Sequence, residues 1–483
     1  MRRTALRKAV SLLAVAVLAL PIGAVGAANA SGRAGWLADR MSEKVTGDAV
    51  ARHLRALTTL TAANGGHRDS ASPGYTAAAD YLTTSLQRAG YVVQRQEFSF
   101  RDYTIHSERA DVVSPQARVL HPQIARFTVS TPAEGLTAEV AVPGVKDTGC
   151  DPEDYAGQDV RGKIVLVRVE GGCFITQKQL TAAAVGASAM LMNVNSPNPD
   201  LNLRYRMVPP EDARVPVATL PRGEAEQLMA DVAAGPTSVR IDLRGEESTT
   251  RTFNLLADTP TGRADNTVVM GAHLDSVDTT PGANDNAAAS AAVLETALRL
   301  KQYTPLLRNK VRFAWWAAEE KGLSGSQFYV DSLTAEQRAH TALYLNLEMI
   351  GSPNFARQVY SGQTPTGPAP AGSERISQLV KGYFAGEELP TADLVLDGRS
   401  DHTAFVNGGI ASGGVNGGSD RLKPAEWVDL FGGVEGQMLD PCYHQLCDGY
   451  GNVNQTIFEQ FSRSMAWAVG RFAIDTSDVN GVR

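Results

Sequence analysis

The chain has 483 residues and a formal net charge of −7, with 45 Lys and Arg against 52 Asp and Glu. This balance excludes the basic footprint of a nucleic-acid-binding protein. The length exceeds what one ordinary hydrophobic core supports and therefore indicates two domains.

The first thirty residues have the pattern of a secretory signal peptide. Arg2 and Arg3 lie in a basic start, an apolar stretch covers residues 11–27, and Ala28-Asn29-Ala30 fits the small-x-small cleavage rule. A membrane anchor is the alternative, but the stretch contains Pro21 and is short for a bilayer span of about 20 residues. We therefore expect a secreted, extracellular protein without membrane attachment after signal cleavage, and the Arg2-Arg3 pair allows a twin-arginine route.

Two helices and a strand are expected next. Apolar residues recur at three-to-four spacing over residues 46–60 and 75–88, which predicts helices there. The second helix would begin after Ser72-Pro-Gly, a typical helix start. Alternation of apolar and polar residues over 91–100 predicts a strand.

Residues 131–245 form a block of different character, with a strand expected at 163–169 and an alanine-rich helix at 175–185. The block resembles the protease-associated domain, a small insert of many secreted peptidases. The matching segments are Cys150-Asp-Pro-Glu-Asp-Tyr, Val160-Arg-Gly-Lys-Ile-Val-Leu-Val, Gly171-Gly-Cys-Phe, Ala184-Val-Gly-Ala-Ser-Ala and Val215-Pro-Val-Ala-Thr-Leu. The block has no cluster of metal ligands in its sequence, so it is either a lid over a substrate path or a structural appendage.

The remaining chain alternates between strands and helices. Apolar runs predict buried strands at residues 266–275, 311–318 and 343–348, and a helix at 287–300. The strands end in His273 and Asp275, in the pair Glu319-Glu320, and in Glu348. An open α/β sheet places its ligand crevice at the carboxyl ends of its strands. We therefore expect these side chains to meet.

These residues and two further blocks have the composition of a two-zinc hydrolase site. Two zinc ions a few ångströms apart need a bridging carboxylate, about one His and one further carboxylate each, and a position for water. That count is supplied by His273, Asp285, Glu320, Glu348 and His444. Glu319, whose side chain points away from that of Glu320, would take the proton of the attacking water. Asp275 would accept the free ring N–H of His273 and fix its tautomer.

Two alternatives stay open at this point. A single His-x-Asp or Glu-Glu pair is more often a solvated surface pair, and only the combination of several blocks favours a metal site. Among the other six histidines, His402 in Gly398-Arg-Ser-Asp-His competes with His444 as a ligand.

At this point the chain resembles the co-catalytic di-zinc aminopeptidases secreted by bacteria, close to the leucine-type enzymes of actinomycetes. The resemblance rests on Ser72-Pro-Gly-Tyr-Thr-Ala-Ala-Ala-Asp-Tyr, Gly271-Ala-His-Leu-Asp, Gly282-Ala-Asn-Asp-Asn, Ala317-Ala-Glu-Glu-Lys-Gly-Leu, Asn346-Leu-Glu-Met-Ile-Gly, Gly398-Arg-Ser-Asp-His and Asp440-Pro-Cys-Tyr-His. It implies an α/β fold, in which helices flank a mixed β-sheet and a small mixed α/β protease-associated domain is inserted. The expected division is a signal peptide at 1–30, a peptidase domain at 31–130 and 246–483, and the insert at 131–245.

The resemblance also implies roles for individual residues. One zinc ion would be held by the residues His273, Asp285 and Glu348, and the other by Asp285, Glu320 and His444. Glu319 would be the general base, and Tyr443 would hydrogen-bond the oxyanion. The family usually has Asp where this chain has Glu348, so the ligand geometry there is expected to differ. The peptide bond between Asp285 and Asn286 is expected to be cis.

The four cysteines fit an exported protein. Cys150 and Cys173 fall in one segment and Cys442 and Cys447 in another, so each pair would close a loop as a disulfide. A four-cysteine zinc site is the alternative. The wide separation of the pairs and the absence of Cys-x-x-Cys in the sequence make it the weaker one.

The sequence therefore predicts a secreted zinc aminopeptidase that removes the first residue of peptides and proteins with free amino termini. The preference for large apolar residues such as leucine comes from the resemblance alone, and Glu319 and Glu348 would hold the substrate amine. The rival functions are glutaminyl cyclase or zinc carboxypeptidase on the same fold, or a catalytically inactive binding module. Two zinc ions per chain are expected, with calcium left open. We expect a monomer whose partners are peptides, neither nucleic acid nor membrane.

Overall fold

The computed structural model describes residues 22–194, 196 and 199–482. The expected signal segment therefore lies outside the described residues up to position 21, and from there the chain forms helix α1 (Ile22–Lys44). None of the helices in the described ranges is long and apolar enough to cross a lipid bilayer.

The larger part of the chain is built on a mixed sheet whose central strands are parallel. Strand β9 (Arg263–His273) lies between β10 (Asn309–Trp316) and β11 (Thr341–Glu348), and all three run in the same direction. On one side the sheet continues with β16 (Ser412–Asn416), β12 (Gln358–Tyr360) and β15 (Ala392–Leu394). On the other side β8 (Ser238–Asp258) pairs antiparallel with β10, and β1 (Val92–Ser114) with β8.

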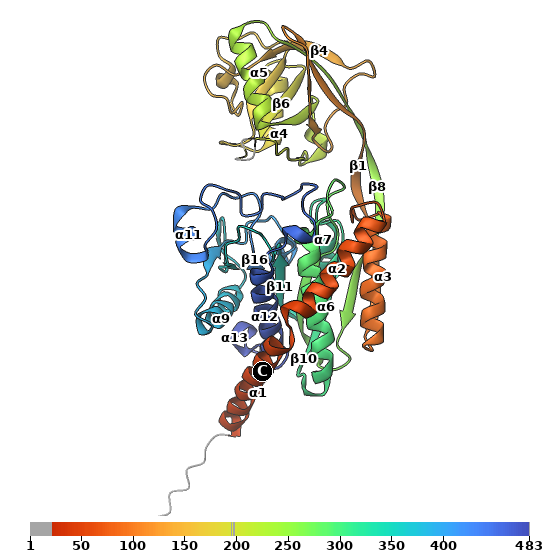
Figure 1. Cartoon of the computed structure of the whole chain (residues 1–483), viewed down its shortest axis with the longest axis vertical. Coiled ribbons are helices and arrows are strands. Elements are labelled where there is room, and N and C mark those ends of the chain that lie inside the picture. The colour runs from red at the N-terminus through yellow and green to blue at the C-terminus, as the bar shows by residue number, and fades with distance from the viewer. Residues whose placement is uncertain (1–21, 195, 197–198, 483) are drawn as a thin grey trace, which may run out of the picture.

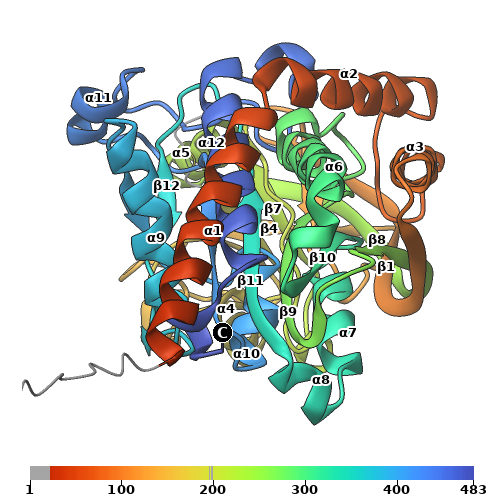
Figure 2. The same ribbon diagram turned by 90° about the horizontal axis from the view of Figure 1, so that it is seen from below.

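Helices cover both faces of this sheet because its central strands are apolar on both sides. In β9, Val268 and Met270 belong to one hydrophobic core and Val269 to the other. The first core is covered by α1, α2 (Gly47–Ala63), α3 (Pro73–Arg88), α6 (Ala288–Leu300), α9 (Ser373–Gly386) and α12 (Gln455–Phe472). The second core is covered by α7 (Ser324–Ser332) and α10 (His402–Asn407), on the opposite side of the sheet from α2 (Figure 2). The predicted α/β class with a mixed, helix-flanked sheet is confirmed.

Several elements match the sequence patterns closely, and others extend beyond them. The helices expected at 46–60, 75–88 and 287–300 are α2, α3 and α6, and the hydroxyl of Ser72 caps α3 by accepting the N–H of Tyr75. The strand expected at 91–100 is the first half of β1, which continues to Ser114. Short elements complete the peptidase part: α8 (Ala335–Ala339), β13 (Gln363–Thr364), β14 (Gly367–Pro368), α11 (Ala425–Phe431) and α13 (Ser477–Asn480).

The insert is attached through a long two-stranded ribbon. Strands β1 and β8 pair from Val92 with Asp258 to Ser114 with Ser238, and they carry the insert above the peptidase part (Figure 1). The insert contains β2 (Arg118–Leu120), β3 (Gln123–Ile124), β4 (Leu136–Ala141), β5 (Ile164–Arg168), α4 (Ile175–Ala184), β6 (Ala189–Val194), β7 (Val217–Pro221) and α5 (Arg222–Ala234). Its own core already includes Tyr103 and Val112 of β1. Because both ribbon strands run from one core into the other, the domain boundaries expected at residues 130 and 245 stay predictions.

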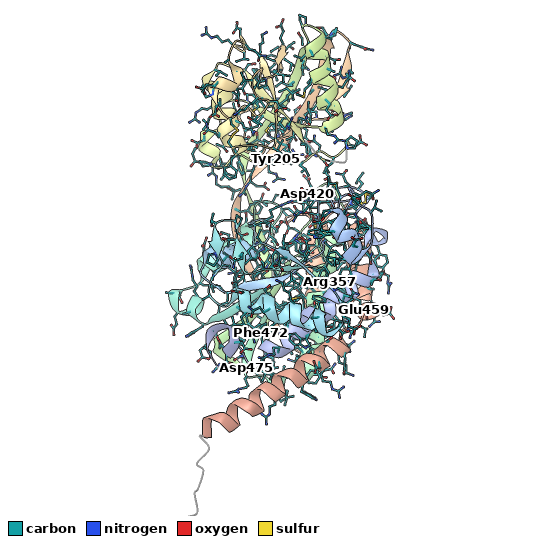
Figure 3. All side chains as sticks on the ribbon, turned by 90° about the vertical axis from the view of Figure 1, so that its left-hand side faces the viewer. Tyr205, Arg357, Asp420, Glu459, Phe472 and Asp475 are labelled. Atoms are coloured by element: carbon teal, nitrogen blue, oxygen red, sulfur yellow. A yellow bond between two sulfur atoms is a disulfide. The ribbon has the colours of Figure 1, made fainter. Side chains whose placement is uncertain are left out.

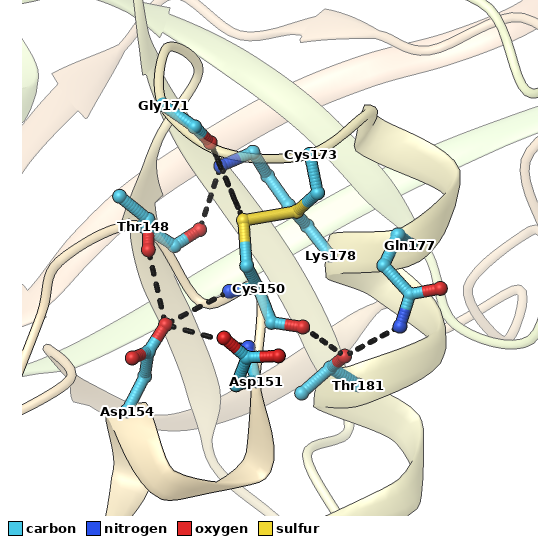
Figure 4. Close-up of a disulfide and its surroundings, with 9 residues drawn as sticks. All are labelled: Thr148, Cys150, Asp151, Asp154, Gly171, Cys173, Gln177, Lys178 and Thr181. Carbon is cyan, nitrogen blue, oxygen red and sulfur yellow. Dashed lines mark hydrogen bonds between the residues drawn. A yellow bond between two sulfur atoms is a disulfide. The ribbon is translucent and has the colours of Figure 1, made fainter.

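Both expected disulfides are present, Cys150 with Cys173 and Cys442 with Cys447. In the insert, the first disulfide lies against the buried Lys178, whose Nζ donates to the carbonyl oxygens of Thr148 and Gly171 (Figure 4). Burial lowers the pKa of Lys178. The disulfide and the lysine thus tie α4 to the loops on either side of β5.

A buried arginine organises the loop that follows β9. Arg68 is fully buried, and its guanidinium donates to the carbonyl oxygens of Leu274 at 2.9 Å, Pro281 at 2.5 Å and Gly282 at 2.6 Å. Burial lowers its pKa to about 10, while surrounding carboxylates act in the opposite direction. One side chain therefore fixes both ends of the loop that leads to Asp285.

We expect Arg68→Met to lower the free energy of unfolding by roughly 2–5 kcal/mol, because several buried carbonyl oxygens lose their donors. Urea unfolding followed by tryptophan fluorescence measures this change. The matched control is Arg88→Met at the exposed end of α3, which should change stability by less than about 0.5 kcal/mol. Equal midpoints for Arg68→Met and wild type would contradict the assigned role.

Candidate metal centre

Three parallel strands deliver the predicted side chains to one edge of the sheet. His273 is the last residue of β9, Glu348 is the last residue of β11, and Glu319-Glu320 follow shortly after the end of β10. Because these strands are neighbours and parallel, their carboxyl ends lie side by side. The strands expected to carry the site do converge on it.

Asp285 lies between the two histidines. Its Oδ1 is 3.3 Å from Nε2 of His273, and its Oδ2 is 3.3 Å from Nε2 of His444. Each histidine contacts one more carboxylate: His273 Nε2 is 3.3 Å from Oε1 of Glu348, and His444 Nε2 is 3.2 Å from Oε2 of Glu320. The five residues thus form two sets of three that share Asp285. The peptide bond between Asp285 and Asn286 is cis, as expected.

Glu348 is held by a residue that the sequence analysis did not single out. Its Oε2 accepts a hydrogen bond of 2.5 Å from the hydroxyl of Ser400, while its other oxygen faces His273. Ser400 in turn accepts from the amide of Asn346, two residues before Glu348. The longer side chain is therefore oriented by a contact on each oxygen.

Asp275 is placed beside His273, but its contact differs from the expected one. The ring Nδ1 of His273 lies 3.1 Å from the backbone carbonyl of Asp275, whereas the nearest carboxylate oxygen is 3.7 Å away. The carboxylate accepts the backbone N–H groups of Glu319 at 3.2 Å and Glu320 at 3.3 Å instead. The expectation was wrong in this detail, since these two amides occupy the carboxylate and a carbonyl lies nearer to the ring.

Asp448 fixes the backbone at Asp285 as Asp275 fixes it at Glu319 and Glu320. The sequence did not predict this role. Its two oxygens accept the backbone N–H groups of Asn284 at 2.8 Å and Asp285 at 3.1 Å. Burial raises its pKa to about 7. The only sequence signal was its position directly after Cys447, which by itself does not distinguish it from a surface aspartate.

The site concentrates negative charge in a buried place. Burial raises the pKa of Glu319 well above its usual range; His273 opposes this change, and Glu320 and Glu348 add to it. Burial alone would lower the pKa of His444, but Glu320 and Asp285 raise it to about 10. Carboxylates this close repel one another unless positive charge lies between them.

The donor set fits divalent metal ions. Ligand atoms of His273, Asp285 and Glu320 lie within 4.8 Å of one another, and so do those of His273, Glu319 and Glu348. Glu320 Oε1 and His444 Nε2 are buried and have no hydrogen-bond partner among the described residues. Imidazole nitrogens and carboxylate oxygens are typical zinc ligands, and a cation would satisfy both atoms.

A cavity opens directly on this cluster. It is lined by His273, Asp285, Glu319, Glu320, Glu348, Met349, Tyr360, Leu394, Arg399, Leu439 and Tyr443, among others. The ring of Tyr443 stacks on that of His444, with 3.9 Å between the ring centroids. Burial raises the pKa of Tyr443 well above its usual value, so its hydroxyl is protonated and able to donate.

His402 lies apart from the cluster. It is almost fully buried at the start of α10, and its ring packs against Tyr360 with 4.7 Å between the centroids. Neither ring nitrogen makes a hydrogen bond within the described part of the chain, and burial lowers its pKa to about 3. The geometry brings His444 rather than His402 to Asp285.

Comparison with known proteins identifies the family. The model for peptidase family M28 matches residues 254–469, and the PA domain model matches residues 136–228. The probable lipoprotein aminopeptidase LpqL of Mycobacterium tuberculosis is 35% identical, covering 92% of this chain and 88% of its own. The chain belongs to peptidase family M28. All of the clustered residues lie within the matched range of this family.

Other M28 relatives extend this picture. An aminopeptidase of Pseudomonas aeruginosa is 36% identical, covering 89% of this chain and 82% of its own, and leucine aminopeptidase 2 of Trichophyton rubrum is 33% identical, covering 84% and 78%. A solved zinc aminopeptidase from Bacillus subtilis, BSAP, has a TM-score of 0.66 at 22% identity over 88% of this chain and 94% of that one. An aminopeptidase from Aneurinibacillus sp. strain AM-1 has a TM-score of 0.67 at 22% identity, over 89% and 95%. The solved structures show that the M28 fold is shared along nearly the whole chain.

We expect His444→Ala to lower the zinc content by about one ion per chain, because it removes the only imidazole on the Glu320 side of Asp285 in the described structure. His402→Phe, which keeps a ring against Tyr360, should leave the zinc content unchanged. Elemental analysis of the dialysed proteins measures both values. Loss of zinc from His402→Phe alone would move the ligand to His402.

Zinc affinity should also fall from wild type to Glu348→Asp and further to Glu348→Ala. The shorter side chain sits on a backbone placed for the longer one, so its oxygens withdraw from both Ser400 and His273. Titration of metal-free protein with zinc compares the three variants. Unchanged affinity in Glu348→Ala would remove Glu348 from the ligand set.

Proposed function

We propose that this protein is a secreted zinc aminopeptidase that removes the first residue from peptides and proteins with free amino termini. The observation that carries the proposal is the sharing of Asp285 between His273 and His444, with Glu319 beside them in an open cavity. The names of the M28 relatives support the aminopeptidase activity. The basic and apolar pattern of residues 1–30 supports export, and we propose that the exported chain acts as a monomer.

Two zinc ions are the proposed cofactors. His273, Asp285 and Glu348 would hold one ion, and Asp285, Glu320 and His444 the other. Zinc bound by such ligands supplies a Lewis acid that polarises a carbonyl group. A separate calcium site has no support among the clusters of the described residues.

Glu319 is the proposed general base. It lines the cavity but takes no part in the short contacts that join Asp285 to the histidines. Its raised pKa suits a carboxylate that takes a proton from water and then passes it to the leaving amine. Asp275 fixes its position by accepting its backbone N–H.

The cavity also supplies groups that would bind the carbonyl oxygen and the amino group of the first substrate residue. The hydroxyl of Tyr443 would donate to the oxyanion that forms from the carbonyl oxygen. Glu319 and Glu348 would bind the protonated amino group of the substrate. Met349, Leu394 and Leu439 line the cavity and favour a large apolar first side chain such as leucine.

The proposed function is tested with three substrates. Leucine p-nitroanilide should be hydrolysed, its N-acetylated analogue should not, and glutamine anilide should give glutamine and aniline rather than pyroglutamyl anilide and ammonia. Hydrolysis of the acetylated compound contradicts the need for a free amine. Pyroglutamyl anilide with release of ammonia would favour a glutaminyl cyclase. No reaction with any of the three would favour a carboxypeptidase or a binding module, because none of these substrates has a free carboxyl end.

Glu319→Gln should lower kcat for leucine p-nitroanilide by about a hundredfold to ten-thousandfold, because glutamine cannot accept the proton. Its zinc content and its unfolding midpoint should stay those of wild type, since no proposed ligand is lost. Steady-state kinetics together with metal analysis measure both. More than a tenth of wild-type kcat would show that another group acts as the base.

A further inference from the structure

A second cavity lies between the insert and the peptidase part. The insert contributes Gln123, Arg126, Asn202, Arg204, Tyr205 and Arg206, and the peptidase part contributes Val277, Asp278, Thr279, Glu320, Lys321 and His444. Figure 3 shows Tyr205 on the lower edge of the insert, facing Asp420 across the gap. Residues 204–206 of the insert therefore lie across this cavity from Glu320 and His444, two of the proposed metal ligands.

The two cavities meet at Glu320, which lines both. The first is formed by the peptidase part alone and has the apolar residues suited to a first side chain. A peptide whose first bond lies at the metal ligands must extend away from that cavity on its other side. The second cavity begins at His444 and Glu320, so it is the available path for the rest of the peptide.

Besides His444, which contacts Glu320 and Asp285, four basic side chains line this second cavity, and three of them are already paired. Arg126 pairs with Asp102 at 2.7 Å, Arg204 with Glu108 at 2.8 Å and Lys321 with Asp69 at 2.6 Å. The fourth, Arg206, is exposed and forms no ion pair with any of the described residues. It is the basic group of the cavity that has a charge to offer to a ligand.

Arg206 is held against the loop that follows Glu319 and Glu320. Its Nη1 donates to the carbonyl oxygen of Lys321 at 3.1 Å, and its guanidinium covers Gly322 so closely that a side chain there would collide with it. Gly322 has φ +94°, which also favours glycine. The guanidinium of Arg206 is thus fixed two residues from Glu320. Its remaining N–H groups donate to no group in the described ranges, so they can bind a ligand.

We propose that Arg206 binds a carboxylate of the substrate on the leaving-group side of the scissile bond, so that the insert selects peptides carrying one there. This inference rests on the proposed aminopeptidase function and names its substrate class. The carboxylate is either the free carboxyl end of a dipeptide or an acidic second side chain. A guanidinium fork matches either one with two parallel hydrogen bonds. The acidic Asp278 and Glu320 face the same cavity and direct the carboxylate towards the insert wall.

Four peptides in two pairs test the proposal and separate the two sources of the carboxylate, and a fifth, Leu-Lys-amide, serves for the charge-reversed variant. Leu-Gly is compared with Leu-Gly-amide for the carboxyl end, and Leu-Glu-amide with Leu-Gln-amide for the side chain. In wild type, the acidic member of at least one pair should have a kcat/KM roughly ten times higher, mainly through a lower KM. In Arg206→Gln this ratio should fall towards one, and Arg206→Lys should lie between. Arg206→Glu should reverse the order and favour Leu-Lys-amide over Leu-Gln-amide.

Arg204→Gln is the matched control, since it removes the same charge from the same segment but at an arginine already paired with Glu108. It should keep the wild-type ratios. Equal rates within both pairs in wild type, or a preference that survives in Arg206→Gln, would overturn the proposal. A wild type that cleaves leucine p-nitroanilide without any carboxylate preference defeats this inference alone, whereas failure on leucine p-nitroanilide and all four peptides defeats the aminopeptidase function.

Discussion

Mutual repulsion among buried carboxylates is the constraint on which the rest of this structure depends. The buried Asp275, Asp285 and Glu348 and the half-buried Glu319 and Glu320 crowd one edge of the sheet, where little water screens their charges. On our proposal, two cations compensate this group of carboxylates, and the two imidazoles that bind the cations are neutral. The surrounding fold serves to hold that group together, and a single missing positive charge would leave several carboxylates uncompensated.

Asp275 and Asp448 position the proposed metal ligands through hydrogen bonds to the backbone, not to the ligands' side chains. Asp275 accepts two consecutive backbone N–H groups, at Glu319 and Glu320, and Asp448 does the same at Asn284 and Asp285. Each thereby fixes the turn that carries a proposed metal ligand, Glu320 in one case and Asp285 in the other. The ligand positions are thus set by main-chain hydrogen bonds, which leave the carboxylate side chains free to bind other groups.

The sequence pattern was sufficient to predict the position of a site residue where that position followed from the residue's own strand or segment. The apolar runs ending at His273 and Glu348 predict buried strands whose carboxyl ends meet, and the structure shows these strands parallel with a shared edge. The partners that come from distant loops could not be predicted, because nothing in the local pattern around Ser400 or Asp448 indicates their targets. The contact of Asp275 was misjudged for a similar reason: which acceptor lies nearer to a ring depends on backbone geometry, not on residue type.

The ribbon of β1 and β8 gives the insert an attachment unlike an ordinary linker. Its strands stay paired along nearly their whole length, so sliding one past the other would break many ladder hydrogen bonds at once. Bending is easier, and the register shifts at Ile105/Ser107 and Val112/Ser114 mark places where paired strands bend. Bending of the ribbon at these places would tilt the insert as one unit relative to the peptidase part, while the two strands stay in register with each other.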